Sequence, residues 1–247
     1  MKLTNKWIFI TGGSRGIGRE IVVNAATQGY TVIFTYRNSH SQAHDLTQSL
    51  AAEGRSVIGY RCDAADFRSV KNLADHLVAE LGAPYAIINN AGITQDSLFI
   101  YMKFDAWRNV LDNNLNSAFF VTQAFLPSMA AQKDGCIIFM SSVAAKIGNV
   151  GQSNYSASKA ALIGLTQTVA QEVGRYNIRV NSIMPGLIDT EVTKKIPQKT
   201  LIDVIKRIPL KRLGTSKEIA ASVSFLLGEN AKYITGQSII VDGGLTS

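Results

Sequence analysis

TGGSRGIG, at residues 11–18, is the stretch that decides the fold of this chain. It follows the apolar run 6–11 and leads into a segment with apolar residues at 17, 21, 22 and 25, the spacing of one helix face. Glycine at 12, 16 and 18 lets the backbone turn sharply and approach a pyrophosphate, which rests on amides at the positive end of the helix. The spacing Gly-x-x-x-Gly-x-Gly is not that of a Walker loop, which ends in Gly-Lys-Ser/Thr, so a kinase-like site is disfavoured.

The alternation of strand and helix patterns continues along the whole chain. Between 70 and 81, for example, apolar residues recur at helical spacing, and Gly82 follows as a stop. Strands rich in Ile, Val and Phe that alternate with such helices predict a parallel sheet covered on both faces. No repeat and no linker divides the chain, so we predict one α/β domain with a doubly wound, seven-stranded parallel sheet. The predicted strands are 6–11, 31–36, 56–61, 85–89, 136–141, 178–183 and 238–241.

Composition excludes several classes of protein. The 247 residues are 46% hydrophobic and 17% charged, which is too apolar for a disordered chain. The longest apolar runs are far shorter than the roughly 20 residues that cross a bilayer. No secretory signal is evident, so we expect a cytoplasmic protein with Cys62 and Cys136 reduced. No metal-ligand motif accompanies the pair His40 and His44, and no RNA-binding motif appears, so neither a metal nor a nucleic acid is expected.

The segment 189–214 departs from this rhythm and is predicted to be an inserted lid over a substrate site. A helix-like stretch in it is flanked by Pro197 and Pro209. Much of the net charge of +7 lies here, since residues 190–212 carry two acidic side chains and seven basic ones: Lys194, Lys195, Lys199, Lys206, Arg207, Lys211 and Arg212. A net charge alone does not identify a partner.

Further motifs follow TGxxxGxG in a fixed order. They are NNAG at 89–92, then Asn114, then Ser142, Tyr155 and Lys159, and finally Pro185-Gly186 after the sixth strand. In this set and order the chain resembles the short-chain dehydrogenase/reductase family. The resemblance covers nearly all 247 residues and implies a single NADP-binding domain of the Rossmann type over residues 1–247. It implies cofactor contacts from Gly12, Ser14, Arg15, Gly16, Ile17, Gly18, Arg37, Asp63, Ala64, Asn90, Ala91, Gly92, Tyr155, Lys159, Pro185, Gly186, Ile188 and Thr190.

The choice of cofactor can be argued from charge. An acidic residue at the end of the second strand binds the ribose hydroxyls of NAD, whereas a basic residue accommodates the 2′-phosphate of NADP. Here that strand ends in Arg37, and Arg15 lies in the glycine loop, so we predict NADPH. Asp63 resembles the family residue that binds the adenine amino group, although a turn or helix-cap Asp would look the same.

Tyr155 and Lys159 are four residues apart and therefore share one face of a helix. Alone, such a pair is usually an exposed helix face, but behind a dinucleotide loop it predicts proton transfer to a carbonyl. A free phenol has a pKa of ~10, and a nearby ammonium favours its ionised form. The resemblance implies that Ser142 binds the substrate oxygen, that Lys159 reaches the ribose and that Asn114 holds a water. We therefore predict Asn114, Ser142, Tyr155 and Lys159 as catalytic, and Ser142, Gln152 and Tyr155 as substrate-binding.

Within the family, the longest shared stretches are those of ketoreductases that act on 3-oxoacyl groups attached to acyl carrier protein. These stretches are 89–96, 148–155, 185–190 and 233–237. The resemblance implies NADPH-dependent reduction to the 3-hydroxyacyl product in fatty acid biosynthesis or a related acyl or polyene pathway. It also implies a homotetramer, whose close packing the small residues Ala157, Ala160, Ala161 and Gly164 would allow.

The acidic carrier would suit the basic lid, with Lys133 and Arg175 as further candidate contacts. One departure affects that surface, because Tyr176 stands where the family enzymes carry Arg. Two alternatives remain open: a reductase of acetoacetyl-CoA or of another ketone or alcohol, and a catalytically silent NADPH-sensing module. Against the second, Tyr155 and Lys159 are both present.

Overall fold

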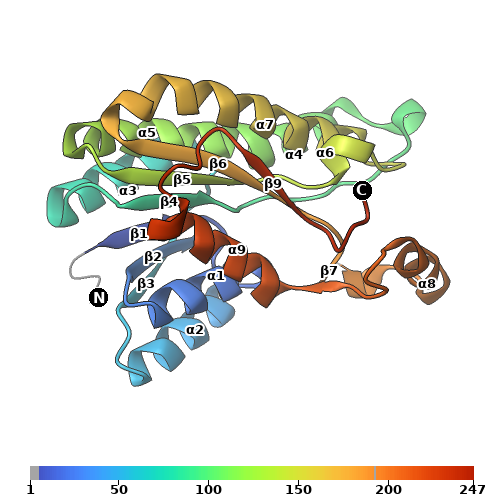
Figure 1. The fold of residues 1–247 in the computed structure, drawn as a ribbon, viewed down its shortest axis with the longest axis horizontal. Coiled ribbons are helices and arrows are strands. Elements are labelled where there is room, and N and C mark those ends of the chain that lie inside the picture. The colour runs from blue at the N-terminus through green and yellow to red at the C-terminus, as the bar shows by residue number, and fades with distance from the viewer. Residues whose placement is uncertain (1–5, 192) are drawn as a thin grey trace.

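The computed structural model describes residues 6–191 and 193–247 of the chain, so residues 1–5 and 192 of the predicted domain lie outside the described part. Its centre is one sheet of seven parallel strands, in the order β3-β2-β1-β4-β5-β6-β9 (Figure 1). All seven predicted strands are present, with bounds that agree to within two residues. The strands are β1 (Trp7–Ile10), β2 (Thr31–Tyr36), β3 (Val57–Arg61), β4 (Ala86–Asn89), β5 (Gly135–Met140), β6 (Ile178–Pro185) and β9 (Ser238–Val241).

Helices cover both faces of this sheet, as predicted. α1, α2 and α9 lie on one face, and α3, α5 and α7 lie on the other, with α4 packed beside α7 (Figure 1). The helices are α1 (Gly16–Thr27), α2 (His40–Ala52), α3 (Phe67–Leu81), α4 (Phe104–Leu111), α5 (Ser117–Gln132), α6 (Ala144–Ile147), α7 (Ser153–Val173), α8 (Gln198–Arg207) and α9 (Ser216–Leu227).

The central strands are apolar on both faces because each face meets a helical layer. In β1, Ile8 and Ile10 join the core under α1 and α9, while Trp7 and Phe9 join the core under α3 and α5. All four side chains are buried. The two-residue period of a strand sends alternate side chains to opposite faces, so two separate cores form from one continuous apolar run.

The order of the strands reverses between β1 and β4. β1 leads through α1 to β2 on one side, whereas β4 and its successors extend the sheet on the other side. The loop after β1 meets the end of β4 at this point, where the Thr11 amide donates to the Ile88 carbonyl over 3.0 Å. Ligands of open parallel sheets bind in the crevice at the carboxyl ends of the strands beside such a reversal.

Two features were not predicted. A π-helix over Asp112–Asn116 joins α4 to α5 and carries Asn114. A second, two-stranded sheet pairs β7 (Ile188–Asp189) with β8 (Gly214–Thr215) at the two ends of the segment 189–214. The predicted helix within that segment is present as α8, which lies apart from both helical layers beyond the carboxyl end of β6 (Figure 1).

Short 3-10 turns complete the connections, at Phe99–Tyr101, Gly174–Tyr176, Thr193–Lys195 and Glu229–Ala231. Among the described residues, none of the helices combines the length and the apolar character needed to cross a membrane.

Candidate active site

The glycine loop between β1 and α1 can be formed only by glycine at several positions. Gly12 has φ +65° and Gly16 has φ +55°, backbone conformations that L side chains rarely adopt. At Gly18 the restriction is steric, because a Cβ there would lie 2.2 Å from the Gly12 carbonyl oxygen. Arg15 at the N-cap of α1 makes no side-chain cap, so no described side chain caps the first amides of this helix. Uncapped amides at a helix N-terminus are a binding site for phosphate groups.

Asn90 locks this loop to the end of β4. Its Nδ2 donates to the carbonyl oxygens of Thr11, over 2.9 Å, and of Gly12, over 3.1 Å. In return the Thr11 hydroxyl accepts from the Asn90 amide over 3.0 Å and from the Ala91 amide over 2.9 Å. The predicted cofactor residues of the two loops are thus brought together.

Arg37, directly after β2, lies near the side chains of Asn113 and of Asp63, the predicted adenine ligand. Its Nη1 donates to Asn113 Oδ1 over 3.0 Å and lies 3.7 Å from Asp63 Oδ2. Asp63 Oδ1 accepts from the Ala65 amide over 3.0 Å, which is the turn role that the sequence left open. Arg15 instead lies 3.7 Å from Glu191 in the segment 189–214. The structure therefore brings Arg37 and Asp63 together, whereas Arg15 forms its ion pair with Glu191.

Tyr155 and Lys159 lie in the first turns of α7, and Ser142 lies just after β5. Burial raises the pKa of the Tyr155 phenol, a hydrogen bond with Ser142 lowers it, and the charge of Asp96 raises it. The net direction is opposite to the one expected from the Tyr–Lys spacing, because burial dominates. A phenol with a raised pKa keeps its proton near neutrality, so its action as an acid requires that the positive charge of protonated Lys159 stabilise the phenolate.

Lys159 is only 4% exposed. Its Nζ donates to the Met140 carbonyl at the end of β5 over 2.7 Å and lies 5.7 Å from the centroid of the Tyr155 ring. Burial lowers the pKa of this amine to about 8. Lys159 can therefore exist in either protonation state close to neutral pH.

We expect Lys159→Met to remove a pH dependence of stability. The pKa is about 8 in the folded protein and 10.5 in an unperturbed lysine, so between these values the unfolded chain binds more protons than the folded one. The free energy of unfolding therefore rises with pH in this window, by at most about 1.4 kcal/mol per pH unit. Urea denaturation at pH 7, 8, 9 and 10 should show this rise in the wild type and in the exposed control Lys217→Met. An equal rise in Lys159→Met would contradict the assignment.

Asn114 is fixed by the π-helix and is 1% exposed. Its Oδ1 accepts from the Ile93 amide over 2.7 Å, and its Nδ2 donates to the Ile93 carbonyl and to Ser158 Oγ, each over 3.0 Å. A Cβ at Gly92 would lie 3.2 Å from Asn114 Oδ1 and 3.3 Å from Lys159 Nζ. Asn114 and Lys159 thus face one small space, which Gly92 keeps open.

The predicted cofactor stretch 185–190 runs from the end of β6 into β7. Gly186 packs against the chain after β9, where a Cβ on it would lie 2.7 Å from Asp242 Cα. The Thr193 hydroxyl accepts from the Thr190 amide and lies 2.9 Å from the Ile188 carbonyl. These contacts hold the stretch at the carboxyl end of the sheet, against the end of β9 and the chain that follows it.

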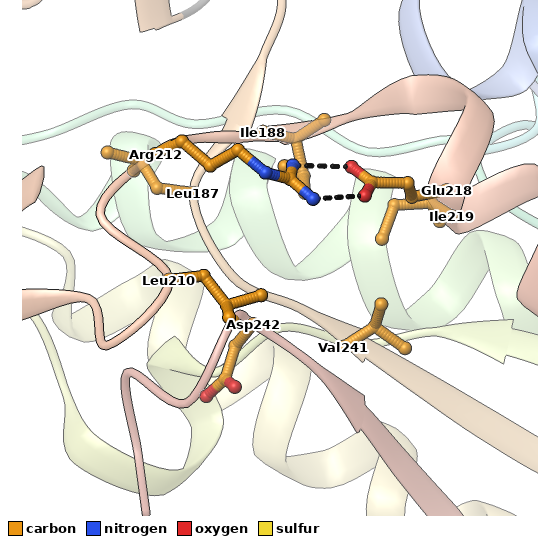
Figure 2. A pocket seen from close by; sticks show the side chains of 10 residues that line it. Leu187, Ile188, Leu210, Arg212, Glu218, Ile219, Val241 and Asp242 are labelled. Atoms are coloured by element: carbon orange, nitrogen blue, oxygen red, sulfur yellow. Dashed lines mark hydrogen bonds and ion pairs between the residues drawn. The ribbon is translucent and has the colours of Figure 1, made fainter.

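Figure 2 shows a pocket at the base of the segment 189–214. Arg212 bridges it with two hydrogen bonds to Glu218, of 3.0 and 2.6 Å, and Glu218 also accepts from the Thr215 amide in the capping box of α9. These bonds lower the pKa of Glu218 to about 2. None of the four predicted catalytic residues lines this pocket, so it neighbours the stretch 185–190 and is not the reaction site. Its lining is Leu187, Ile188, Leu210, Arg212, Gly214, Glu218, Ile219, Val241, Asp242 and Gly243.

The basic side chains predicted in the segment 189–214 are exposed wherever they are described. Two are paired, since Arg212 binds Glu218 and Lys206 lies 3.2 Å from Asp203. The side chain of Lys195 lies outside the described part of the chain. Among the residues that the structure describes, no group of three or more His, Cys, Asp or Glu side chains could hold a metal ion.

Sequence reasoning did not single out the residues that hold α7 in place. Asn154 is fully buried and its Nδ2 donates to the Gln95 carbonyl over 3.1 Å and the Ala106 carbonyl over 3.3 Å. Ser158, also fully buried, donates to the Tyr155 carbonyl and accepts from Asn114. A signal for them is their polar character at the positions just before Tyr155 and Lys159.

Comparison with known proteins gives consistent results. The family model described as enoyl-(acyl carrier protein) reductase matches residues 12–246. The chain is 40% identical over 245 residues to the 3-oxoacyl-[acyl-carrier-protein] reductase FabG of Staphylococcus aureus, covering 99% of both chains. It is 39% identical over 241 residues to the protein of that name from Staphylococcus epidermidis, covering 98% of this chain and 99% of the relative. The Thermotoga maritima protein of that name is 39% identical over 249 residues, covering 99% of both chains.

Proposed function

Because the chain belongs to the short-chain dehydrogenase/reductase family, we propose that it reduces 3-oxoacyl groups on acyl carrier protein with NADPH. The observation that carries this proposal is the similarity over nearly the whole chain to relatives named for that reaction. It is supported by the hydrogen bond of Ser142 with the Tyr155 phenol and by the buried Lys159, whose Nζ lies 5.7 Å from the centroid of the Tyr155 ring. The product is the 3-hydroxyacyl thioester, a step of fatty acid biosynthesis or a related carrier-bound pathway.

The residues present fit a dinucleotide. Gly12 and Gly18 let the loop pack closely against its own backbone and against the end of β4, a Cβ at Gly16 would meet nothing within 4 Å, and the N-cap of α1 makes no side-chain cap, which leaves its first amides to a pyrophosphate. For the 2′-phosphate of NADPH, Arg37 lies at the end of β2, and Ser39 at the N-cap of α2 makes no side-chain cap. We propose NADPH over NADH because no acidic residue occupies the end of β2.

The mechanism follows from the hydrogen-bond donors beside Tyr155. When bound, NADPH supplies the hydride that reaches the 3-keto carbon. Tyr155 donates its phenolic proton to the keto oxygen, and Ser142 donates a hydrogen bond to the same oxygen and aligns it. The ammonium form of Lys159 stabilises the phenolate that remains. Asn114 keeps Lys159 and its neighbouring space in place, where a water can return the proton.

We propose the segment 189–214 as the lid that covers the acyl chain, with exposed lysines and arginines that attract an acidic carrier. We further propose a homotetramer in the cytoplasm. Two observations support self-association: Ala160 and Gly164 are exposed on α7, and Phe99 and Ile100 near α4 are 77% and 81% exposed. Light scattering on the purified protein tests the assembly, and a monomer would contradict it.

The function is tested by following loss of NADPH absorbance with three substrates: acetoacetyl-carrier protein, acetoacetyl-CoA and crotonyl-carrier protein. We expect the first to be reduced fastest, and with NADPH rather than NADH. Turnover of acetoacetyl-CoA alone would assign a CoA-linked reductase. The description of the family model makes reduction of the enoyl bond a second candidate, and turnover of only crotonyl-carrier protein would favour it. NADPH binding without turnover of any ketone would favour the sensing module.

A further inference from the structure

A short chain of hydrogen bonds joins Asp96 to the loop that precedes Tyr155. Asp96 Oδ2 accepts from Gln152 Nε2 over 2.9 Å, and Gln152 Oε1 accepts from Asn149 Nδ2 over 2.9 Å. Both polar atoms of the Gln152 side chain are therefore engaged within the protein, although the sequence predicted Gln152 as a substrate ligand.

The backbone on either side of Asp96 is bonded to the start of α7 and to the loop before it. The Gln95 carbonyl accepts from Asn154 Nδ2 over 3.1 Å, and the Ser97 amide donates to the Gly151 carbonyl over 2.8 Å. The backbone of Asp96 is thus fixed on both sides, and its exposed carboxylate accepts the hydrogen bond from Gln152.

The loop itself needs such a restraint. Gly148 and Gly151, in the loop between α6 and α7, have φ of +67° and +82°. Glycine is the residue type with the greatest backbone freedom, so both positions leave this loop easily deformed. Val150 between them is 86% exposed and adds no packing. The loop leads directly into the first turn of α7, which carries Tyr155.

We propose that Asp96 is a positioning residue, which acts through Gln152 to hold the loop 148–152 so that Tyr155 faces the keto oxygen. This inference rests on the proposed function only for the identity of the substrate. Asp96 also acts on Tyr155 by its charge. Burial raises the pKa of the Tyr155 phenol, the hydrogen bond with Ser142 lowers it and the Asp96 charge raises it, while the Lys159 amine lies 5.7 Å from the centroid of the Tyr155 ring.

Four variants separate these effects. Asp96→Ala removes both the hydrogen bond and the charge, whereas Asp96→Asn keeps an acceptor oxygen for Gln152 and removes only the charge. Gln152→Glu places two carboxylates next to each other, which repel. Adding Asp96→Asn restores the hydrogen bond with the roles exchanged, because the amide at position 96 now donates to the carboxylate at position 152. Asp105→Asn, an exposed carboxylate in the first turn of α4, is the matched control.

We expect Asp96→Ala and Gln152→Glu to lower kcat about ten- to hundredfold, with KM changed less than about threefold. Amide exchange over 148–152 should become about tenfold faster in both. The double variant should recover both properties. In Asp96→Asn the Tyr155 phenol, followed by tyrosinate absorbance against Tyr155→Phe, should titrate at lower pH than in the wild type.

Unchanged kcat and unchanged exchange in Asp96→Ala would overturn the proposal, and so would a double variant no better than Gln152→Glu alone. Exchange and phenol titration are measured on the free protein without substrate. If the wild type reduced none of the ketones tested, the proposed function would fail while these two measurements still decided the role of Asp96.

Discussion

Replacing Tyr155 with phenylalanine is expected to lower kcat about a thousandfold while NADPH binds with nearly unchanged affinity. A positioned general acid contributes roughly 10²- to 10⁴-fold, and the Tyr155 phenol is the proton donor that a hydrogen bond links to Ser142. Phenylalanine keeps the ring and its packing in α7, so only the proton is lost. Steady-state NADPH oxidation gives kcat, and cofactor fluorescence titration gives the dissociation constant.

Tyr60→Phe is the matched control, because Tyr60 is a partly buried tyrosine on β3, distant in the sheet order from β5 and α7. This variant should keep kcat within about twofold of the wild type. A loss of less than about tenfold in Tyr155→Phe would mean that water or Ser142 can supply the proton, and the assignment of Tyr155 would then be wrong.

The sheet could be predicted from the sequence because its signals are local. The central strands are runs of apolar residues covered on both faces, and the glycine loop marks the first strand-to-helix crossover. The two short strands β7 and β8 could not be predicted in this way. Each has two residues, and they pair across 26 positions of sequence that carry α8, so no periodicity marks them.

The site was predictable as a set of residues but not as a network. Asn114 was identified by resemblance, whereas the π-helix that turns it toward Lys159 has no distinctive sequence pattern. The direction of the Tyr155 pKa also depends on burial, which the Tyr–Lys spacing does not encode. Likewise, the contact of Arg37 with Asp63 joins the ends of β2 and β3, and only the paired sheet brings them together.

Gly18→Ala is the second change with a large expected effect, and its cause is purely steric. Gly18 lies in the first turn of α1 and has no positive φ, so alanine suits the local backbone and has the higher helix propensity. The new Cβ, however, would lie 2.2 Å from the Gly12 carbonyl oxygen and 2.5 Å from Asn90 Nδ2. The loop must shift, and the bonds that Asn90 makes to Thr11 and Gly12 are lost with it.

We expect this variant to bind NADPH at least about tenfold more weakly and to lose about 1–3 kcal/mol of unfolding free energy, the usual cost of overpacking. Isothermal titration measures the NADPH affinity, and urea denaturation measures the unfolding free energy.

Gly174→Ala, at an exposed helix end where a Cβ meets nothing within 4 Å, is the control and should change neither quantity by much. If Gly18→Ala weakened cofactor binding without loss of stability, the Cβ would act on the pyrophosphate itself. If it lost stability alone, the contact of Asn90 with the glycine loop would serve the sheet rather than the cofactor. We expect loss of both cofactor affinity and unfolding free energy, because the same loop geometry serves the binding of the cofactor and the packing of the loop against Asn90.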